Sequence, residues 1–363
     1  MSGGVDSAVA GAMLLEQGYD PVGCFMRLGE QGEAVEAAGK GVKLHHRGCC
    51  SISDAGDARR VCDMLGMPFY AVDFSTDFKR IVDYFEAEYH AGRTPNPCVR
   101  CNDWLKFGRL FDYAEAVGAQ WIATGHHARI EHIDGLPRLR RGHDFAKDQS
   151  YVLFGQPTAR LAKMLLPVGS MTKDDVRYRA TELKLPVASK PDSMEICFVP
   201  DTDYVGLLRR RSPEAFEQGE IHDTDGTVLG THDGHQQFTI GQRRGLNLAF
   251  GEPRYVTAKD PAANTVTIGP RSALASAGCT AHESVWHVNP ETQWLPCRAQ
   301  VRAHGEGLPA RVRASSDTTL EIEFATPHDA IAPGQAVVCY QGDLVCCGGW
   351  INRTLQAEES FDA

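Results

Sequence analysis

The residues best suited to chemistry in this sequence are cysteines in two short segments. Cys98 and Cys101 form a Cys-x-x-Cys pair within residues 94–102, and Cys197 follows much later, within residues 193–198. The first pair opens a segment with helical spacing, and the dipole at a helix N-terminus favours the thiolate of a nearby cysteine. Two thiols at one site could relay sulfur, with one carrying a persulfide and the other helping to release it. Three thiols could instead ligate an iron–sulfur cluster or an incomplete zinc site.

A glycine-rich loop at residues 2–7, with the sequence SGGVDS, leads directly into a helical pattern. Paired glycines let the backbone approach a phosphate, and the helix N-terminus supplies free N–H groups and a positive dipole. Ser2 and Ser7 can add hydroxyl hydrogen bonds, while Asp6 can hold Mg²⁺ bound to the phosphates. The loop has no Lys-Ser/Thr pair and is therefore not a Walker A loop. An ordinary glycine-rich turn with serine and aspartate caps is the alternative.

A phosphate loop of this kind should follow the first, central strand of its sheet, yet Met1 stands immediately before Ser2. A strand of about 5–6 residues is typical, and its loss from the middle of a sheet would be costly. We therefore expect a further segment upstream of residue 1, from an earlier start codon or from a longer chain.

The order of the predicted elements indicates an α/β fold for the first part of the chain. Helical spacing alternates there with short apolar runs. The helices are predicted over 7–17, 57–65, 78–89 and 104–116, and the strands over 21–26, 68–74 and 121–124. This rhythm predicts a parallel sheet covered by helices on both faces, with ligands bound beyond the carboxyl ends of the strands.

Beyond about residue 203 short β-like runs replace the helical periods, with Gly, Pro, Asn and Asp between them. The runs lie at 227–229, 255–258, 265–268, 311–312 and 336–340. We therefore predict three domains: an α/β domain over 1–203 that carries the glycine-rich loop and the candidate cysteines, a small β-rich domain over 204–274 and a C-terminal β-barrel over 275–355.

The composition is that of a globular protein, with 42% hydrophobic and 23% charged residues. No apolar run approaches the roughly 20 residues needed to cross a bilayer, and the first residues do not resemble a signal peptide. Twelve cysteines in a chain of this length favour catalytic or metal-binding thiols in the cytoplasm over a disulfide framework. The net charge of −10 argues mildly against nucleic-acid binding, but arginine clusters such as 138–141 and 209–211 permit an RNA partner.

The SGGVDS loop resembles the PP-loop of the ATP pyrophosphatases, which cleave ATP to AMP and pyrophosphate. Five further motifs occur in the order and approximate spacing of the bacterial tRNA-specific 2-thiouridylases. They are RTPNPxxxCN from residue 93, ATGHHAR at 123–129, KDQSYVL at 147–153, SMEICFVP from residue 193 and TIGQRRGL at 239–246. The resemblance extends from residue 1 to about 350. It implies a parallel-sheet PP-loop domain of the adenine nucleotide alpha hydrolase type, a small β-rich tRNA-binding domain and a C-terminal β-barrel.

The resemblance also implies residue roles. Cys101 matches the nucleophile, Cys197 matches the persulfide-bearing cysteine, and Asp6 completes the predicted catalytic set as the Mg²⁺ ligand. The implied ATP-binding positions are Ser2, Gly3, Gly4, Val5, Asp6, Ser7, Met26 and Gly125. The implied tRNA-binding positions are Asn96, Pro97 and Cys98 at the target base, and His126, Lys147, Asp148, Gln149 and Gln335 elsewhere.

The implied reaction is ATP-dependent thiolation of the wobble uridine of tRNA, at position 34. ATP adenylates the C2 oxygen with release of pyrophosphate, and sulfur then attacks C2 with loss of AMP. The implied cofactors are ATP and Mg²⁺, with a [4Fe-4S] cluster under the cluster interpretation. The implied partners are tRNAs for Lys, Glu and Gln, together with a persulfide sulfur-carrier protein or a cysteine desulfurase.

The sequence departs from the family pattern at two places. Cys98 stands where many members carry Asp, so Cys98, Cys101 and Cys197 are candidate ligands of an iron–sulfur cluster. His-Gly-Glu at 304–306 replaces a basic-aromatic run. The tRNA contacts of that run are therefore expected to fall on the arginines nearby, at positions 302, 311 or 313.

Two other functions remain as alternatives. A different PP-loop ligase or amidotransferase would adenylate a small molecule, but it would leave Cys101, Cys197 and two β-rich domains without a task. A tRNA-binding, sulfur-trafficking scaffold would keep the fold without catalysis, and the intact Asp6, Ser7 and cysteines argue against it.

Overall fold

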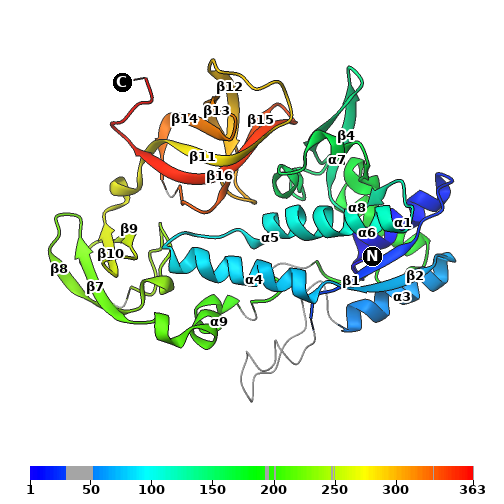
Figure 1. Cartoon of the computed structure of the whole chain (residues 1–363), viewed down its shortest axis with the longest axis horizontal. Helices are drawn as coiled ribbons and strands as arrows, with labels where there is room; N and C mark the ends of the chain where they lie inside the picture. Colours follow the sequence, from blue (N-terminus) through cyan, green and yellow to red (C-terminus); the bar gives the residue numbers. More distant parts are fainter. Residues whose placement is uncertain are drawn as a thin grey trace. The chain divides into compact units, whose positions relative to one another are not determined.

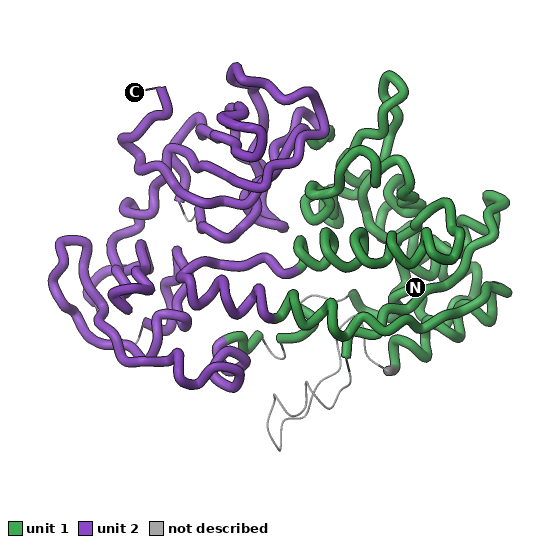
Figure 2. Tube along the Cα trace, in the orientation of Figure 1, with its two compact units in different colours: residues 1–82, 98–204, 343–345 green, residues 83–97, 205–342, 346–363 purple. Residues whose placement is uncertain are grey.

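The computed structural model describes residues 1–29, 52–192, 196–199, 202–246, 248, 250–329 and 331–362. The chain divides into two compact units, coloured green and purple in Figure 2. The first comprises residues 1–82, 98–204 and 343–345, and the second comprises residues 83–97, 205–342 and 346–363. None of the described helices is long and apolar enough to cross a membrane.

The first unit has the predicted alternation of helices and parallel strands. Strand β1 (Gly23–Arg27) pairs in parallel with β2 (Phe69–Asp73), and β3 (Ile122–Ala123) pairs in parallel with β6 (Met164–Leu165). Both pairs have the predicted parallel direction, and no described strand hydrogen-bonds to both of them. An antiparallel hairpin of β4 (Ala128–Ile133) and β5 (Leu136–Arg141) follows β3.

Helices α1 (Val5–Glu16), α3 (Ile52–Leu65) and α8 (Lys173–Glu182) pack around one apolar cluster in this unit. Small and branched side chains fill it, including Ala8, Val9, Val61 and Val176. Helix α1 ends before Gly18, whose φ of +85° fits the glycine stop that the sequence predicts. This packing fixes the N-terminal ends of α1 and α8, which carry Asp6 and Lys173.

Three helical stretches run without interruption through the first cysteine pair. Helix α5 (Pro97–Arg100) begins at a proline, a residue suited to the first helical turn. A π-helical stretch (Cys101–Arg109) follows, and α6 (Leu110–Ala116) completes the run. The predicted helix at 104–116 is therefore present and longer than predicted. The other α-helices in the described part of the chain are α4 (Ser75–His90), α7 (Thr158–Leu161) and α9 (Tyr204–Arg211).

The second unit contains the two β-rich modules that the sequence predicts. The central module is a four-stranded sheet in the order β8-β7-β10-β9, formed by β7 (Gln218–Asp223), β8 (Val228–Asp233), β9 (Tyr255–Asp260) and β10 (Thr265–Gly269). The barrel follows in yellow to red in Figure 1, in the order β11-β14-β13-β12-β15-β16. Its strands are β11 (Ser276–Trp286), β12 (Leu295–Gln300), β13 (Leu308–Ser316), β14 (Thr319–His328), β15 (Ala336–Gln341) and β16 (Leu344–Gln356). Pairing between β11 and β16 closes the barrel, which confirms the predicted architecture.

Candidate active site

The glycine-rich loop is organised around the hydroxyl of Ser7. Ser7 Oγ accepts from the backbone N–H of Ser2 at 3.1 Å, lies 3.1 Å from Ser2 Oγ and donates to Gly4 O at 3.1 Å. Helix α1 begins at Val5, and Gly4 at its N-cap has no side chain with which to cap the first turn. The N–H groups of this turn and the positive end of the helix dipole are therefore suited to bind a phosphate.

Two glycines allow the chain to close tightly around this loop. Gly3 has a φ of +73°, and a Cβ atom there would lie 2.3 Å from the carbonyl oxygen of Asp54. Gly125 lies against the loop from outside, where a Cβ atom would be 2.6 Å from the backbone nitrogen of Ser7. A side chain at either position would therefore push the loop out of shape. The structure thus places the predicted ATP-binding residue Gly125 beside the predicted phosphate loop.

Asp6 is held by two basic side chains from distant parts of the unit. Lys173 Nζ donates to both carboxylate oxygens, at 2.7 and 2.8 Å, and His127 Nε2 lies 3.1 Å from Oδ1. Burial alone would raise the pKa of Asp6, but hydrogen bonds from His127 and Lys173 keep it below its ordinary value. The side chain is therefore a carboxylate, as an Mg²⁺ ligand must be.

A second lysine fixes the other side of the loop. Lys190 Nζ donates to the carbonyl oxygen of Gly3 at 2.9 Å and to Asp57 at 2.6 Å, and it also pairs with Asp54. Burial opposes the charge on Lys190, but the hydrogen bonds that it donates to these two aspartates raise its pKa. Neither Lys173 nor Lys190 was identified from the sequence, because both lie far from the loop in the chain and belong to no local motif.

The nucleophile predicted from the sequence lies at the start of the π-helical stretch, a feature frequent at functional sites. Cys101 packs at the edge of an apolar cluster that also contains Met26 and Phe198. The ring of Phe198 meets that of Phe78 edge-on, with centroids 5.7 Å apart. Phe198 directly follows Cys197, so this contact ties the second cysteine segment to the cluster around Cys101.

The three candidate cluster ligands differ in exposure: Cys98 and Cys197 are exposed, and Cys101 is partly buried. Within the described ranges, no group of three or more His, Cys, Asp or Glu side chains is arranged to hold a metal ion. Residues 193–195 of the SMEIC motif lie outside the described residues.

The predicted tRNA-binding stretch at 147–149 contains side chains of two kinds. Asp148 is used internally, because its carboxylate accepts from Arg141 at 2.7 Å and from the backbone N–H of Gly142 at 2.9 Å. Gln149 Oε1 accepts from the backbone N–H of His127 at 2.9 Å. The side chain of Lys147 is 40% exposed, and Gln149 is exposed as well. Of the three side chains, Lys147 is the one with the positive charge that attracts an RNA phosphate.

His126, another predicted tRNA contact, is buried. Its Nδ1 lies 2.7 Å from Thr124 Oγ1, and its ring packs 5.8 Å from that of Phe107 in the π-helical stretch. Burial lowers the pKa of His126 well below its ordinary value, so the ring is neutral. The role visible in the structure is to support the helix that carries Cys101. The neighbouring His127, which the sequence did not single out, is the histidine that contacts Asp6.

In the second unit, Gln335 holds the loop that precedes the first cysteine pair. Its Nε2 donates to the carbonyl oxygens of Thr94 and Pro95, both at 3.1 Å, and its Oε1 accepts from Asn96 Nδ2 at 3.4 Å. Two residues predicted separately, Asn96 and Gln335, are therefore in contact. Pro97 follows directly as the first residue of α5.

Two of the arginines expected to replace the missing basic run lie side by side on β13. The guanidinium groups of Arg311 and Arg313 are 4.3 and 4.2 Å from the ring centre of Trp294. Both donate to Asp362 at 2.9 Å, and they also pair with Glu323 and Glu321 respectively. Their charges are thus largely balanced by neighbours, which weakens the expectation that they replace the tRNA contacts.

Comparison with known proteins identifies the family of the chain. Residues 1–201 match the model of the tRNA methyl transferase HUP domain, 207–270 that of the tRNA methyl transferase PRC-barrel domain and 276–351 that of the aminomethyltransferase beta-barrel domain. The tRNA-specific 2-thiouridylase MnmA of Rhodopirellula baltica is 44% identical, over 98% of this chain and 96% of its own length. The proteins of the same name from Chloroflexus aurantiacus and Beutenbergia cavernae are 45% and 47% identical, over 97% and 95% of this chain. The chain belongs to the tRNA-specific 2-thiouridylase family.

The segments that match the family models include the residues of the site described above. The phosphate loop, Lys173, Lys190 and all three cysteines fall within the first matched segment. Gln335 falls within the third. The resemblance predicted from six short motifs is therefore confirmed along almost the whole chain.

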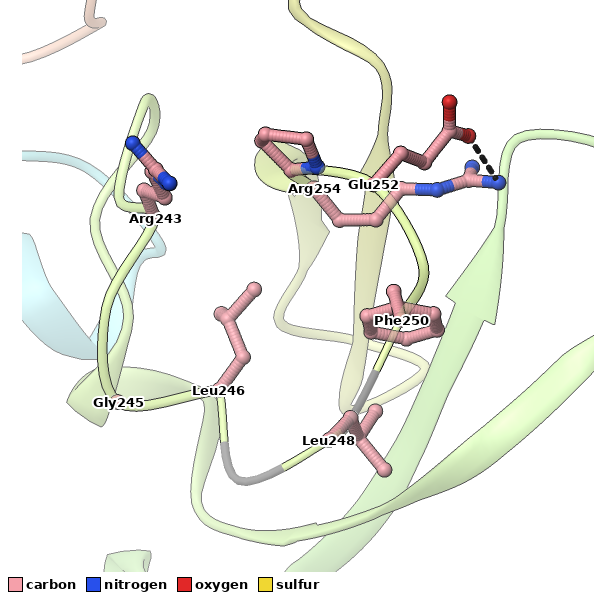
Figure 3. A pocket seen from close by; sticks show the side chains of 8 residues that line it. Arg243, Gly245, Leu246, Leu248, Phe250, Glu252 and Arg254 are labelled. Atoms are coloured by element: carbon pink, nitrogen blue, oxygen red, sulfur yellow. Dashed lines mark ion pairs between the residues drawn. The ribbon is translucent and has the colours of Figure 1, made fainter.

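A shallow pocket lies in the segment matched by the second family model. Figure 3 shows Arg243, Gly245 and Leu246 of the TIGQRRGL motif facing Phe250 and Arg254 across it. Arg254 is already paired with Glu252 at 3.0 Å and with Asp223 at 3.0 Å. The motif thus contributes three of the residues that line this depression in the central module.

Proposed function

We propose that this protein catalyses ATP-dependent 2-thiolation of the wobble uridine in tRNA, in the cytoplasm. The observation that carries the proposal is the pair of sites within one unit. A phosphate loop with a fixed carboxylate lies in the same unit as Cys101, whose apolar cluster includes the residue following Cys197. The phosphate loop with its carboxylate provides what adenylation requires, and the two cysteines provide what sulfur transfer requires.

In the first half-reaction, the C2 oxygen of the uridine attacks the α-phosphorus of ATP and pyrophosphate leaves. The N–H groups at the start of α1 and the hydroxyls of Ser2 and Ser7 bind and orient the phosphates. Asp6 would hold Mg²⁺, because one carboxylate together with substrate phosphates is a common Mg²⁺ environment. The ion would supply charge neutralisation for the departing pyrophosphate.

In the second half-reaction, a persulfide on Cys197 attacks C2 through its outer sulfur and AMP leaves. The Cys101 thiolate then attacks the inner sulfur, which breaks the sulfur–sulfur bond, leaves 2-thiouridine and forms a Cys101–Cys197 disulfide. A thiol reductant must reopen this disulfide, and a persulfide donor protein or a cysteine desulfurase must reload Cys197. The accepting tRNAs are those for Lys, Glu and Gln.

A direct assay tests this function. The purified chain, ATP, Mg²⁺, a persulfide donor and unmodified tRNA for Lys should together yield 2-thiouridine, detected by mass spectrometry of digested nucleosides. AMP and pyrophosphate should appear in proportion to it. Pyrophosphate release that is independent of tRNA would indicate a different PP-loop ligase. Binding of tRNA without release of pyrophosphate would indicate a scaffold. The methyl transfer named in the family description would require a methylated nucleoside in the same digest.

Replacement of Cys98 separates the relay from the cluster. Under the relay that we propose, Cys98 has no required bond to make or break, so Cys98→Ala should retain activity within about threefold in air. Iron content should be negligible in protein purified without oxygen. Roughly four irons per chain, an absorption band near 400 nm and joint loss of iron and activity in Cys98→Ala would instead establish the cluster.

A further inference from the structure

The carboxylate of Asp192 lies between two lysines that belong to different proposed sites. Its Oδ1 accepts from Lys173 Nζ at 2.9 Å, and its Oδ2 accepts from Lys147 Nζ at 2.9 Å. Lys173 is the residue that binds Asp6 in the phosphate loop, and Lys147 is the positively charged residue of the predicted tRNA-binding stretch. One side chain is thus shared by the phosphate side and the tRNA side of the first unit.

Asp192 is itself firmly anchored. Arg177 donates to Oδ1 at 2.9 Å and, through its other terminal nitrogen, to the backbone carbonyls of Ala188 and Lys190 at 3.1 and 3.0 Å. Burial disfavours the charge, yet hydrogen bonds from Lys147 and Lys173 lower the pKa of Asp192 to about 2. Asp192 is therefore a fixed negative charge at any working pH.

The ammonium group of Lys173 is fully used in this arrangement. It has three N–H donors, and three acceptor atoms surround it: the two oxygens of Asp6 and one of Asp192. The side chain is only 10% exposed, so water cannot easily replace a lost partner. To donate to a phosphate in the loop, Lys173 must first release one of these acceptors.

The acceptor to be released is Asp6, because Mg²⁺ bound with the nucleotide competes for the same carboxylate. Asp192 then keeps Lys173 next to the loop with one donor bound and the others free for the phosphate. Without Asp192, Lys173 would have Asp6 as its remaining anionic partner and would compete more strongly with the metal. Lys147 would at the same time lose the carboxylate that orients its exposed ammonium group.

We propose that Asp192 is a positioning residue shared by the two substrates, holding Lys173 for the phosphates of ATP and Lys147 for a phosphate of the tRNA. The inference rests on the proposed function, since it assigns partners within the same site. It adds that a single carboxylate, five positions before Cys197 in the chain, serves both substrates.

The test uses the full chain with Asp192→Asn and two separate binding measurements. The first is the Mg²⁺ concentration needed for half-maximal binding of an ATP analogue with a methylene between its α- and β-phosphates. The second is the affinity for tRNA at fixed salt. We expect each to worsen about tenfold, as for loss of a charge-assisted hydrogen bond. Asp192→Glu, which keeps the charge, should return both to within about threefold of wild type. Glu115→Gln removes a carboxylate from an exposed pair with Lys163 and should change neither.

A double-mutant cycle distinguishes positioning from general support of the fold. If Asp192 acts on tRNA through Lys147, Asp192→Asn should weaken tRNA binding by less than about twofold once Lys147→Gln is present. Fully additive losses, unchanged binding in Asp192→Asn or failure of the Glu variant to rescue would each overturn the inference. If the wild-type chain binds neither the analogue nor tRNA, the proposed function fails and this inference fails with it. Normal wild-type binding with a normal Asp192→Asn variant removes this inference alone.

Discussion

Cys101→Ser and Cys197→Ser are each expected to reduce 2-thiouridine formation by at least about a thousandfold, the scale seen when a catalytic nucleophile is removed. Serine has nearly the same size as cysteine, but its hydroxyl neither carries a persulfide nor ionises at neutral pH. Affinity for an ATP analogue should stay within about twofold, because neither cysteine lies in the phosphate loop. Single-turnover formation of 2-thiouridine, together with equilibrium binding of the analogue, provides the measurement.

Cys24→Ser is the matched control for these two variants. Cys24 lies in β1 of the same unit, and burial raises the pKa of its thiol, so it is a poor nucleophile. We expect normal thiolation from this variant. Substantial 2-thiouridine from either Cys101→Ser or Cys197→Ser would contradict the two-cysteine mechanism, whatever the control shows.

Asp6→Asn should lower tRNA-dependent pyrophosphate release by about 10²–10³-fold, the range for loss of one preorganised electrostatic group in an active site. The amide keeps the size of the side chain but neither holds Mg²⁺ as an anion nor balances the charge of Lys173. Among the described residues, the Asp6 carboxylate bonds to Lys173 and His127 and not to a backbone N–H group of its own helix. The loss of pyrophosphate release should therefore reflect the role of Asp6 in adenylation and not the loss of a helix cap.

Asp174→Asn makes the same change in the first turn of α8, at an exposed position next to Lys173. Pyrophosphate release should be normal in this control, and both variants should melt within a few degrees of wild type. Raising the Mg²⁺ concentration should not restore Asp6→Asn. Retained pyrophosphate release in Asp6→Asn would show that Asp6 has no role in adenylation and serves only at the start of helix α1.

The residue pairs around Asp6 show where sequence-based reasoning reached its limit. The SGGVDS loop identified Asp6 itself, since its chemistry follows from neighbours within a few positions. Its partner Lys173 is 167 positions away, and its second partner His127 is 121 positions away. The ATGHHAR motif predicted His126 as a tRNA contact, but it did not predict that the adjacent His127 contacts Asp6. The sequence alone does not show which of these two adjacent histidines contacts Asp6.

The KDQ stretch shows the same limit in another form. Its three polar residues look equivalent in sequence, but the fold holds Asp148 in a network with Arg141 and Gly142 and leaves the side chain of Lys147 40% exposed. Conversely, Asn96 and Gln335 were predicted from motifs far apart in the chain, and their contact became visible only in the folded unit.

The sequence by itself determined the phosphate loop, the helix that follows it, the cysteines, the change to β-rich modules after about residue 203 and the family. These depend on local backbone preferences, on periodicity and on motifs of a few residues, all of which are readable from neighbouring positions. The tertiary structure alone decided that Lys173 and Lys190 contact the loop, that Asp192 contacts Lys173, and that Phe198 brings the second cysteine segment to the cluster of Cys101. Such pairs form because helix and strand packing carries distant residues together, and a charge buried in this way needs a partner whose position no local pattern records.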